Sequence, residues 1–172
     1  MFSDPLKNLK AIPLKEDDVV ADMGAGTGYY SIAAGTLSPR GKVYAIEIEK
    51  DYLETIKIKV RDAHLSNVEI ISGDVEKLGG TKINDHVATV VVVSNILFQV
   101  EKKDIFLKEV KRVLRPKGKV LLVDWSPNSF IHKKAVIPKN EARAMFEENG
   151  FVFEREINAG EHHYGMILNK NI

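Results

Sequence analysis

Residues 19–28 read VVADMGAGTG, a short apolar run that ends in an acid and is followed by glycines at alternate positions. The apolar run predicts a buried strand, and the glycines predict a turn in which backbone can approach a ligand where any Cβ would collide. A helix-like pattern starts at Tyr29. Because such a turn also serves as a tight connection between strand and helix, other positions must decide whether it binds a nucleotide.

Length and composition limit the class of protein. The chain has 172 residues, 44% of them hydrophobic, which suffices for one well-buried core, and we expect a single domain over residues 1–172 with residues 1–14 capping the cofactor. The net charge of +1 gives no general attraction for a polyanion, so nucleic-acid binding is not indicated. No apolar run reaches membrane length and no secretory signal is recognisable, which favours a cytoplasmic protein. The lack of cysteine excludes disulfides, thiolate zinc sites and cysteine nucleophiles.

Strand-like segments alternate with helical patterns along the chain. Strands are expected at 19–23, 42–47, 67–72, 86–93, 119–123, 151–157 and 162–169. Helices are expected from residue 29, from an N-cap at Asp51, and over 102–114 and 139–148, with a turn at 115–118. The last two strands follow each other without a helix and predict a hairpin. The predicted fold is therefore α/β: a doubly wound, mostly parallel seven-stranded sheet of Rossmann-like type with an antiparallel C-terminal hairpin strand.

Polar residues follow several of the predicted strands. In an open parallel sheet, ligands bind beyond the carboxyl ends of the strands, and those ends carry the glycine turn, Glu47, Asp74 and the pairs 94–95 and 124–125. A carboxylate at Glu47 can accept hydrogen bonds from ribose hydroxyls, and Asp74 can accept one from an adenine amino group. Acids at strand ends also cap helices, so each one alone is ambiguous, but together they predict a nucleoside site.

Residues 22–28 resemble the first motif of the class I S-adenosylmethionine-dependent methyltransferases, which is an acid, any residue, and then glycines at alternate positions. The similarity continues through 43–47, 68–74 and 109–118 and into the closing hairpin, so it covers nearly the whole chain. Within the family, the chain looks most like the small-molecule branch that includes quinone-biosynthesis methyltransferases.

The resemblance implies S-adenosylmethionine as the cofactor and S-adenosylhomocysteine as the product. It places the glycine loop against the amino-acid part of the cofactor and assigns the acid after the second strand to the ribose. Two apolar residues sandwich the adenine, and the residues after the fourth strand border the sulfonium. The cofactor-binding residues that it implies are Asp22, Gly24, Ala25, Gly26, Gly28, Glu47, Ile48, Asp74, Val75, Ser94 and Asn95.

Methyl transfer from a sulfonium needs no metal and no covalent intermediate, so alignment of the acceptor dominates, and we expect no metal site. The candidate catalytic residues are Asn95, His132 and His162. Further candidates for contact with the acceptor follow the fourth or fifth strand or lie at the hairpin, namely Gln99, Asp124, Trp125, His163 and Tyr164. Because side chains alternate along a strand, at most one of the two adjacent histidines faces the cleft.

The alternatives come from several classes. Within the methyltransferases we favour a small-molecule acceptor over RNA or protein, since no Asn-Pro-Pro-Tyr-like tetrad follows the fourth strand. An NAD(P)-dependent oxidoreductase would share the sheet and the second-strand acid, but its Gly-x-Gly-x-x-Gly spacing differs from the spacing here. A non-catalytic nucleotide-binding or interaction domain is the third alternative. We allow for a homodimer as the assembly state.

Overall fold

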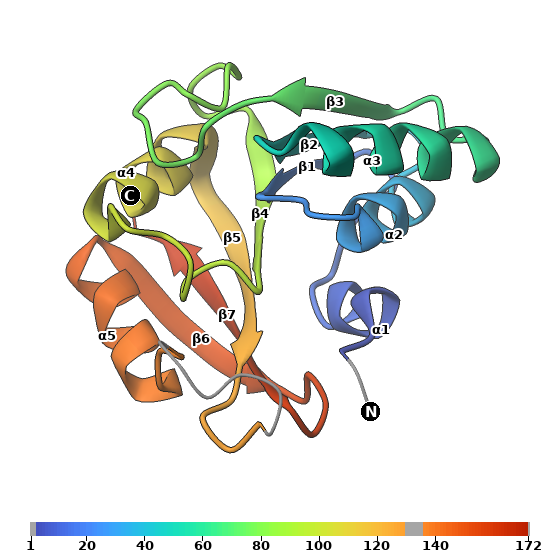
Figure 1. The fold of residues 1–172 in the computed structure, drawn as a ribbon. Coiled ribbons are helices and arrows are strands. Elements are labelled where there is room, and N and C mark those ends of the chain that lie inside the picture. Colours follow the sequence, from blue (N-terminus) through green and yellow to red (C-terminus); the bar gives the residue numbers. More distant parts are fainter. Residues whose placement is uncertain (1–2, 130–135, 172) are drawn as a thin grey trace.

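The computed structural model describes residues 3–129 and 136–171. Within them, one seven-stranded sheet has the strand order β3-β2-β1-β4-β5-β7-β6 (Figure 1). The strands are β1 (Val19–Met23), β2 (Lys42–Glu47), β3 (Val68–Ser72), β4 (Ala88–Ser94), β5 (Leu114–Trp125), β6 (Phe151–Ile157) and β7 (His163–Lys170). The helices are α1 (Pro5–Lys10), α2 (Tyr29–Leu37), α3 (Lys50–Asp62), α4 (Lys103–Val113) and α5 (Lys139–Glu148).

Strands β1 to β5 pair in parallel, and β7 runs antiparallel to both β5 and β6. The predicted α/β class and the reversed final strand are confirmed. The strand order turns back at β1, because β2 and β3 extend to one side of it and β4 and β5 to the other. The crevice beyond the carboxyl ends of β1 and β4 is therefore the place where this architecture binds ligands.

Helices cover both faces of the sheet. On one face, α1 and α2 bury Leu9, Tyr30 and Ala34 against the sheet, while α4 and α5 pack on the opposite face (Figure 1). Strand β4 is buried on both sides, which explains its uninterrupted run of valines at 90–93. None of the helices in the described residues combines the length and apolarity needed to cross a membrane.

Three local predictions are corrected by the structure. Strand β4 begins at Ala88 rather than at His86, whose φ of 57° places it in a turn. Helix α3 begins at Lys50, and its N-cap is Glu49 rather than Asp51. Asp51 lies in the first turn, where its negative charge interacts favourably with the positive end of the helix dipole.

The third correction concerns the turn predicted at 115–118, which lies inside β5. Leu114 pairs with Ala88 and Lys119 pairs with Val90, so four residues of β5 lie opposite a single residue of β4. The extra residues, 115–118, include Lys117, which has a φ of 62°. The proline and glycine of the segment therefore interrupt the ladder between β5 and β4 without ending the strand.

Candidate active site

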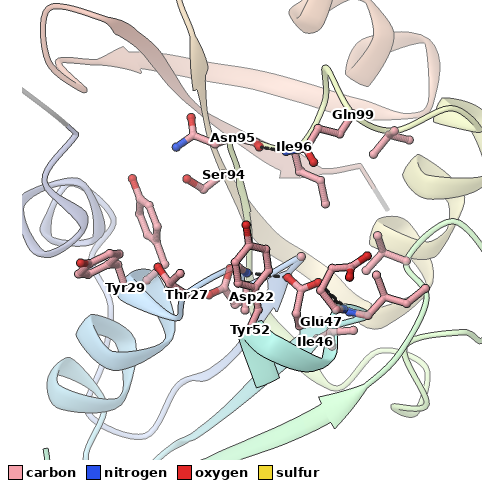
Figure 2. Close-up of a pocket in the computed structure, with 18 of the residues that line it drawn as sticks. Asp22, Thr27, Tyr29, Ile46, Glu47, Tyr52, Ser94, Asn95, Ile96 and Gln99 are labelled. Carbon is pink, nitrogen blue, oxygen red and sulfur yellow. Dashed lines mark hydrogen bonds between the residues drawn. The ribbon is translucent and has the colours of Figure 1, made fainter. Parts of the chain in front are cut away.

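A cleft of about 980 Å³ lies at the carboxyl ends of β1 to β4 (Figure 2). That volume is near the upper end for small-molecule sites, so it can hold a nucleoside cofactor together with part of a second ligand. The structure brings almost all of the predicted cofactor residues to its walls: Asp22, Gly24, Ala25, Gly26, Glu47, Ile48, Asp74, Val75, Ser94 and Asn95. Gly28 is the exception, since it is the N-cap of α2, where a φ of 82° requires glycine.

Glu47 ties the end of β2 to the glycine loop. Its Oε2 accepts the N–H of Gly26 at 2.7 Å, and its Oε1 accepts the N–H groups of Ile48 and Glu49 at 2.8 and 3.0 Å. A carboxylate offers about four lone-pair sites, so these bonds leave capacity on Oε2 for a ligand hydroxyl. The side chain is thus fixed in position before any ligand arrives, with an acceptor directed at the cleft.

An added side chain would have different consequences at Gly24 and at Gly26. Gly24 has a φ of +74°, which favours glycine, and a Cβ added there would stand 2.1 Å from Cδ1 of Ile96, so the Ile96 side chain would have to move. A Cβ at Gly26 would meet nothing within 4 Å, although its φ is +54° and it lines the cleft. The Cβ position of Gly26 is therefore open space beside a residue that lines the cleft.

Asp22 is buried at the end of β1. Its Oδ2 accepts the hydroxyl of Ser31 in α2 at 2.6 Å. Burial raises the pKa of this carboxyl, the Ser31 bond opposes that shift and the nearby charge of Glu47 adds to it, and together they bring the pKa to about 6. The resemblance places Asp22 among the cofactor-binding residues, and the bond described here joins β1 to α2.

Replacing Asp22 with asparagine should stabilise the protein at alkaline pH. The pKa of Asp22 in the folded protein lies above the ordinary value of 3.8, so ionisation of this carboxyl disfavours folding. The stabilising contribution of Asp22 is therefore complete below pH 3.8 and is lost as the pH rises through about 6. We expect Asp22→Asn to exceed the wild type by about 1–3 kcal/mol in unfolding free energy near pH 8. Urea denaturation at roughly pH 4, 6 and 8 measures the difference, which should grow with pH; a constant difference would contradict the assigned shift.

Asp74 lies beyond the end of β3 and reaches the cleft through a short loop. Its Oδ1 accepts the N–H of Glu76 at 2.9 Å, and Lys77 approaches Oδ2 at 3.2 Å. Its own N–H donates to the carbonyl oxygen of Gly80 at 3.0 Å. The position of Asp74 therefore depends on the segment around Gly80.

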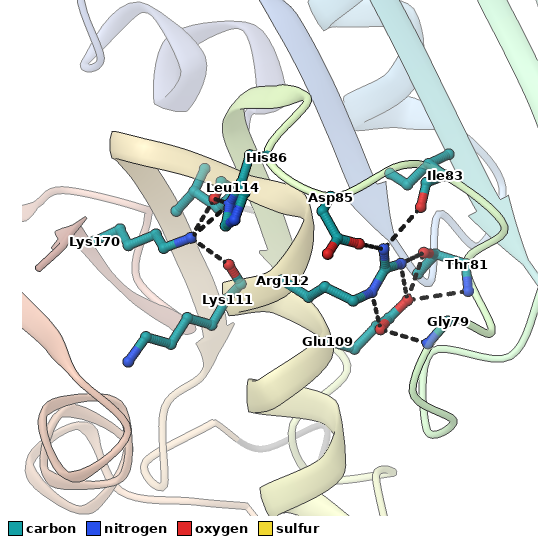
Figure 3. Close-up of polar contacts among 10 residues, drawn as sticks. All are labelled: Gly79, Thr81, Ile83, Asp85, His86, Glu109, Lys111, Arg112, Leu114 and Lys170. Atoms are coloured by element: carbon teal, nitrogen blue, oxygen red, sulfur yellow. Dashed lines mark hydrogen bonds and ion pairs between the residues drawn. The ribbon is translucent and has the colours of Figure 1, made fainter. Parts of the chain in front are cut away.

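That segment is anchored by a buried carboxylate from α4 (Figure 3). Glu109 accepts the N–H groups of Gly79 and Thr81 at 2.8 and 3.2 Å and the Thr81 hydroxyl at 2.5 Å. Arg112 donates two further hydrogen bonds to it at 2.8 and 2.7 Å. Burial opposes ionisation, but these donors together lower the pKa of Glu109 to about 2.

Four of the predicted acceptor contacts line the cleft: Asn95, Gln99, Trp125 and His163. His162 does not line it, because the residue opposite Trp125 in the register between β5 and β7 is His163, and the two rings stack with centroids 4.1 Å apart. His132 lies outside the described residues. Tyr164 belongs to the core on the other face of the sheet, where burial raises the pKa of its hydroxyl.

Asp124 is buried next to the cleft and has a positioning role. Its carboxylate accepts the N–H of Leu97 at 2.9 Å and that of Trp125 at 2.7 Å. It thereby joins the segment after β4 to the end of β5. Asp124 was predicted to follow a strand and contact the acceptor, but it lies inside β5 and its side chain does not line the cleft.

The segment before β1 also reaches the cleft, which Ser3 and Pro5 help to line. The hydroxyl of Tyr30 accepts a hydrogen bond from Nδ2 of buried Asn8 at 2.8 Å and lies 3.1 Å from Oγ of Ser3. Burial raises the pKa of Tyr30. Sequence reasoning missed Ser3 and Asn8, whose polar partners no local pattern indicates.

The charged residues in the described lining of the cleft are all acidic. Among the described residues around the cleft, none is lysine or arginine, and five are acidic: Asp22, Glu47, Glu49, Asp74 and Glu76. The described residues contain no group of three or more histidines or acids arranged to hold a metal ion. The cleft therefore favours cationic or neutral ligands.

Comparisons with known proteins agree with this geometry. The sequence profile of a family described as a methyltransferase domain matches residues 14–170. A demethylmenaquinone methyltransferase of Geobacillus sp. (strain WCH70) is 28% identical over 124 residues, which cover 72% of this chain and 52% of that protein. A probable ribosomal RNA small subunit methyltransferase A of Pyrococcus furiosus is 36% identical over 96 residues, covering 55% of this chain and 31% of that protein.

Among solved structures, a SAM-dependent methyltransferase from Aquifex aeolicus superimposes with a TM-score of 0.88 at 26% identity, covering 98% of this chain and 90% of that one. The chain thus spans most of that protein, but only about half or less of the two relatives compared by sequence.

Proposed function

Because this chain belongs to the class I S-adenosylmethionine-dependent methyltransferases, we propose that it transfers a methyl group from S-adenosylmethionine to a small acceptor that is not anionic. The observation that carries the proposal is the pairing of Gly26 with Glu47 at 2.7 Å, at the point where the strand order turns back. This pairing puts an open backbone loop next to a carboxylate that can accept a ribose hydroxyl, both in the wall of the cleft.

The residues present fit the cofactor. Glu47 would accept a ribose hydroxyl, Asp74 would accept the adenine amino group, and the loop at 24–26 would lie against the amino-acid part. Ile48 and Val75 offer apolar surface to the adenine ring. When bound, the cofactor supplies a methyl group made electrophilic by its sulfonium.

The protein's task is then to align and enclose the reactants. The carboxyl end of β4 places Ser94 and Asn95 on the wall across the cleft from Tyr29 and Thr27 (Figure 2). Asp22, once ionised, supplies negative charge for a cationic ligand. Holding two reactants in line can supply most of the acceleration that such a displacement needs.

The choice of a small acceptor rests on charge. RNA-binding surfaces neutralise phosphates with lysine and arginine, and the described lining of this cleft has neither. By their names, one of the two relatives compared by sequence methylates a quinone precursor and the other methylates ribosomal RNA. The acidic lining supports the small-molecule side of that division. We treat residues 1–172 as one cofactor-binding unit in which residues 3–14 cover one end of the cleft.

Fractionated cell extract tests the nature of the acceptor. The purified protein, given S-adenosylmethionine, should produce S-adenosylhomocysteine in the small-molecule fraction and not in the macromolecular fraction. Mass spectrometry of the product measures both, with each fraction also incubated without the protein as a control. Production confined to the macromolecular fraction would contradict the small acceptor, and the protein content or nuclease sensitivity of that fraction would separate protein from RNA.

A further inference from the structure

The end of the cleft beyond β4 and β5 differs in character from the cofactor end. Its wall consists of Asn95, Trp125 and His163, which we call the acceptor wall. Trp125 and His163 face each other across the ladder between β5 and β7, with their rings tilted by 34° and 91% or more of each residue buried. This wall has two aromatic side chains and no carboxylate, whereas the five acids of the lining lie within β1 and β2 or in the segments that follow β2 and β3.

Asn95 carries two unfavourable features at this wall. Its φ is +53°, a left-handed conformation that is uncommon outside glycine and that asparagine tolerates better than most residues, and its N–H is held by the carbonyl oxygen of Val123 at 2.9 Å. Its carboxamide oxygen is buried with no hydrogen-bond partner. Strained backbone and unsatisfied buried polar atoms concentrate at functional sites, where a ligand can relieve them.

We propose, on the premise of the function given above, that Asn95 orients the methyl acceptor by accepting a hydrogen bond from an O–H or N–H group on an uncharged aromatic ring that packs against Trp125 and His163. The Cβ–Cγ bond of Asn95 has a broad torsional preference, so rotation about it can turn the carboxamide oxygen toward the cleft that this residue lines. Aromatic side chains favour contact with other rings. The five carboxylates of the lining disfavour a ring that carries negative charge.

The protein contains one tryptophan, so a nitrogen-15 correlation spectrum has a single indole N–H signal that reports on the acceptor wall. We would titrate the protein, saturated with S-adenosylhomocysteine to prevent turnover, with four probes. Phenol satisfies every condition, anisole lacks the donor, cyclohexanol lacks the aromatic ring, and benzoate is anionic. Phenol should shift the indole signal with a dissociation constant at least about tenfold lower than that of each other probe.

Two variants separate the effect of the Asn95 carboxamide from the effect of its positive φ. Asn95→Gly removes the carboxamide and suits the positive φ, so it should fold with unchanged or raised stability while the dissociation constant of phenol rises about tenfold. Lys117→Gly relieves the same kind of strain at an exposed site away from the cleft, at a φ of 62°, and should bind phenol as the wild type does.

The outcomes distinguish a failure of the role given to Asn95 from a failure of the proposed function. If the wild type binds S-adenosylhomocysteine but phenol and anisole bind equally, or Asn95→Gly binds phenol normally, the role of Asn95 is wrong and the proposed function stands. Equal binding of benzoate or cyclohexanol would overturn the uncharged or the aromatic character of the acceptor. If the wild type binds neither S-adenosylmethionine nor S-adenosylhomocysteine, the proposed function fails, and this inference fails with it.

Discussion

Replacing Glu109 with alanine should lower the free energy of unfolding by about 3–5 kcal/mol, because it leaves buried donors and a guanidinium without their acceptor. Glu109 is completely buried, and Arg112 beside it has only 17% of its side chain exposed. The carboxylate holds the segment at 79–81 to α4, and that segment in turn fixes Asp74 (Figure 3). Urea denaturation at neutral pH measures the loss.

Asp85→Ala is the matched control for this prediction. Asp85 also pairs with Arg112, at 2.5 Å, but its side chain is 64% exposed, so its removal should cost no more than about 1 kcal/mol. Because the pKa of Glu109 is lowered from 4.5 to about 2, its contribution is present above pH 4.5 and is lost as the pH falls toward 2. Equal losses in the two variants at neutral pH would contradict the buried anchor.

Replacing Gly26 with alanine should weaken S-adenosylmethionine binding by roughly 10- to 100-fold, because the added methyl group enters space that the ligand needs and such overlap costs about 1–3 kcal/mol. The protein itself should tolerate the change, since a Cβ there meets nothing within 4 Å. The positive φ alone should cost about 1–2 kcal/mol of stability. Calorimetric titration measures the affinity.

Gly79 provides the matched control for Gly26. It also has a positive φ, of +76°, and also has nothing within 4 Å of an added Cβ, but it does not line the cleft. Gly79 belongs to the segment that fixes Asp74, but alanine keeps the N–H that Glu109 accepts, so Gly79→Ala should lose a similar amount of stability and keep the affinity of the wild type. A similar affinity loss in both variants would mean that backbone strain, and not occupation of the ligand position, explains the effect at Gly26.

The cofactor end of the cleft was predictable because its residues lie directly after strands. The strand pattern fixes where Glu47 and Ser94 emerge, and parallel pairing brings the carboxyl ends of neighbouring strands together. The acceptor end was less predictable. The choice between His162 and His163 depends on register with β5, which periodicity within one strand cannot determine.

The anchor at Glu109 shows a different limit. Residues 79 and 81 lie 28 or more positions from Glu109 in sequence, and no motif links them. One sign was present, since a charged residue occupies the apolar face formed by Phe106, Val110 and Val113. A buried acid on a predicted apolar face requires donors, but the sequence does not say from which loop they come.

Calorimetric titration of the wild-type protein with S-adenosylmethionine, S-adenosylhomocysteine and NADH tests most directly whether the cleft at β1, β2 and β4 holds an adenosyl sulfonium. We expect S-adenosylmethionine and its product each to bind at one site per chain, and NADH to give no saturable heat. Saturable binding of NADH with none of S-adenosylmethionine would contradict the methyltransferase and favour an oxidoreductase.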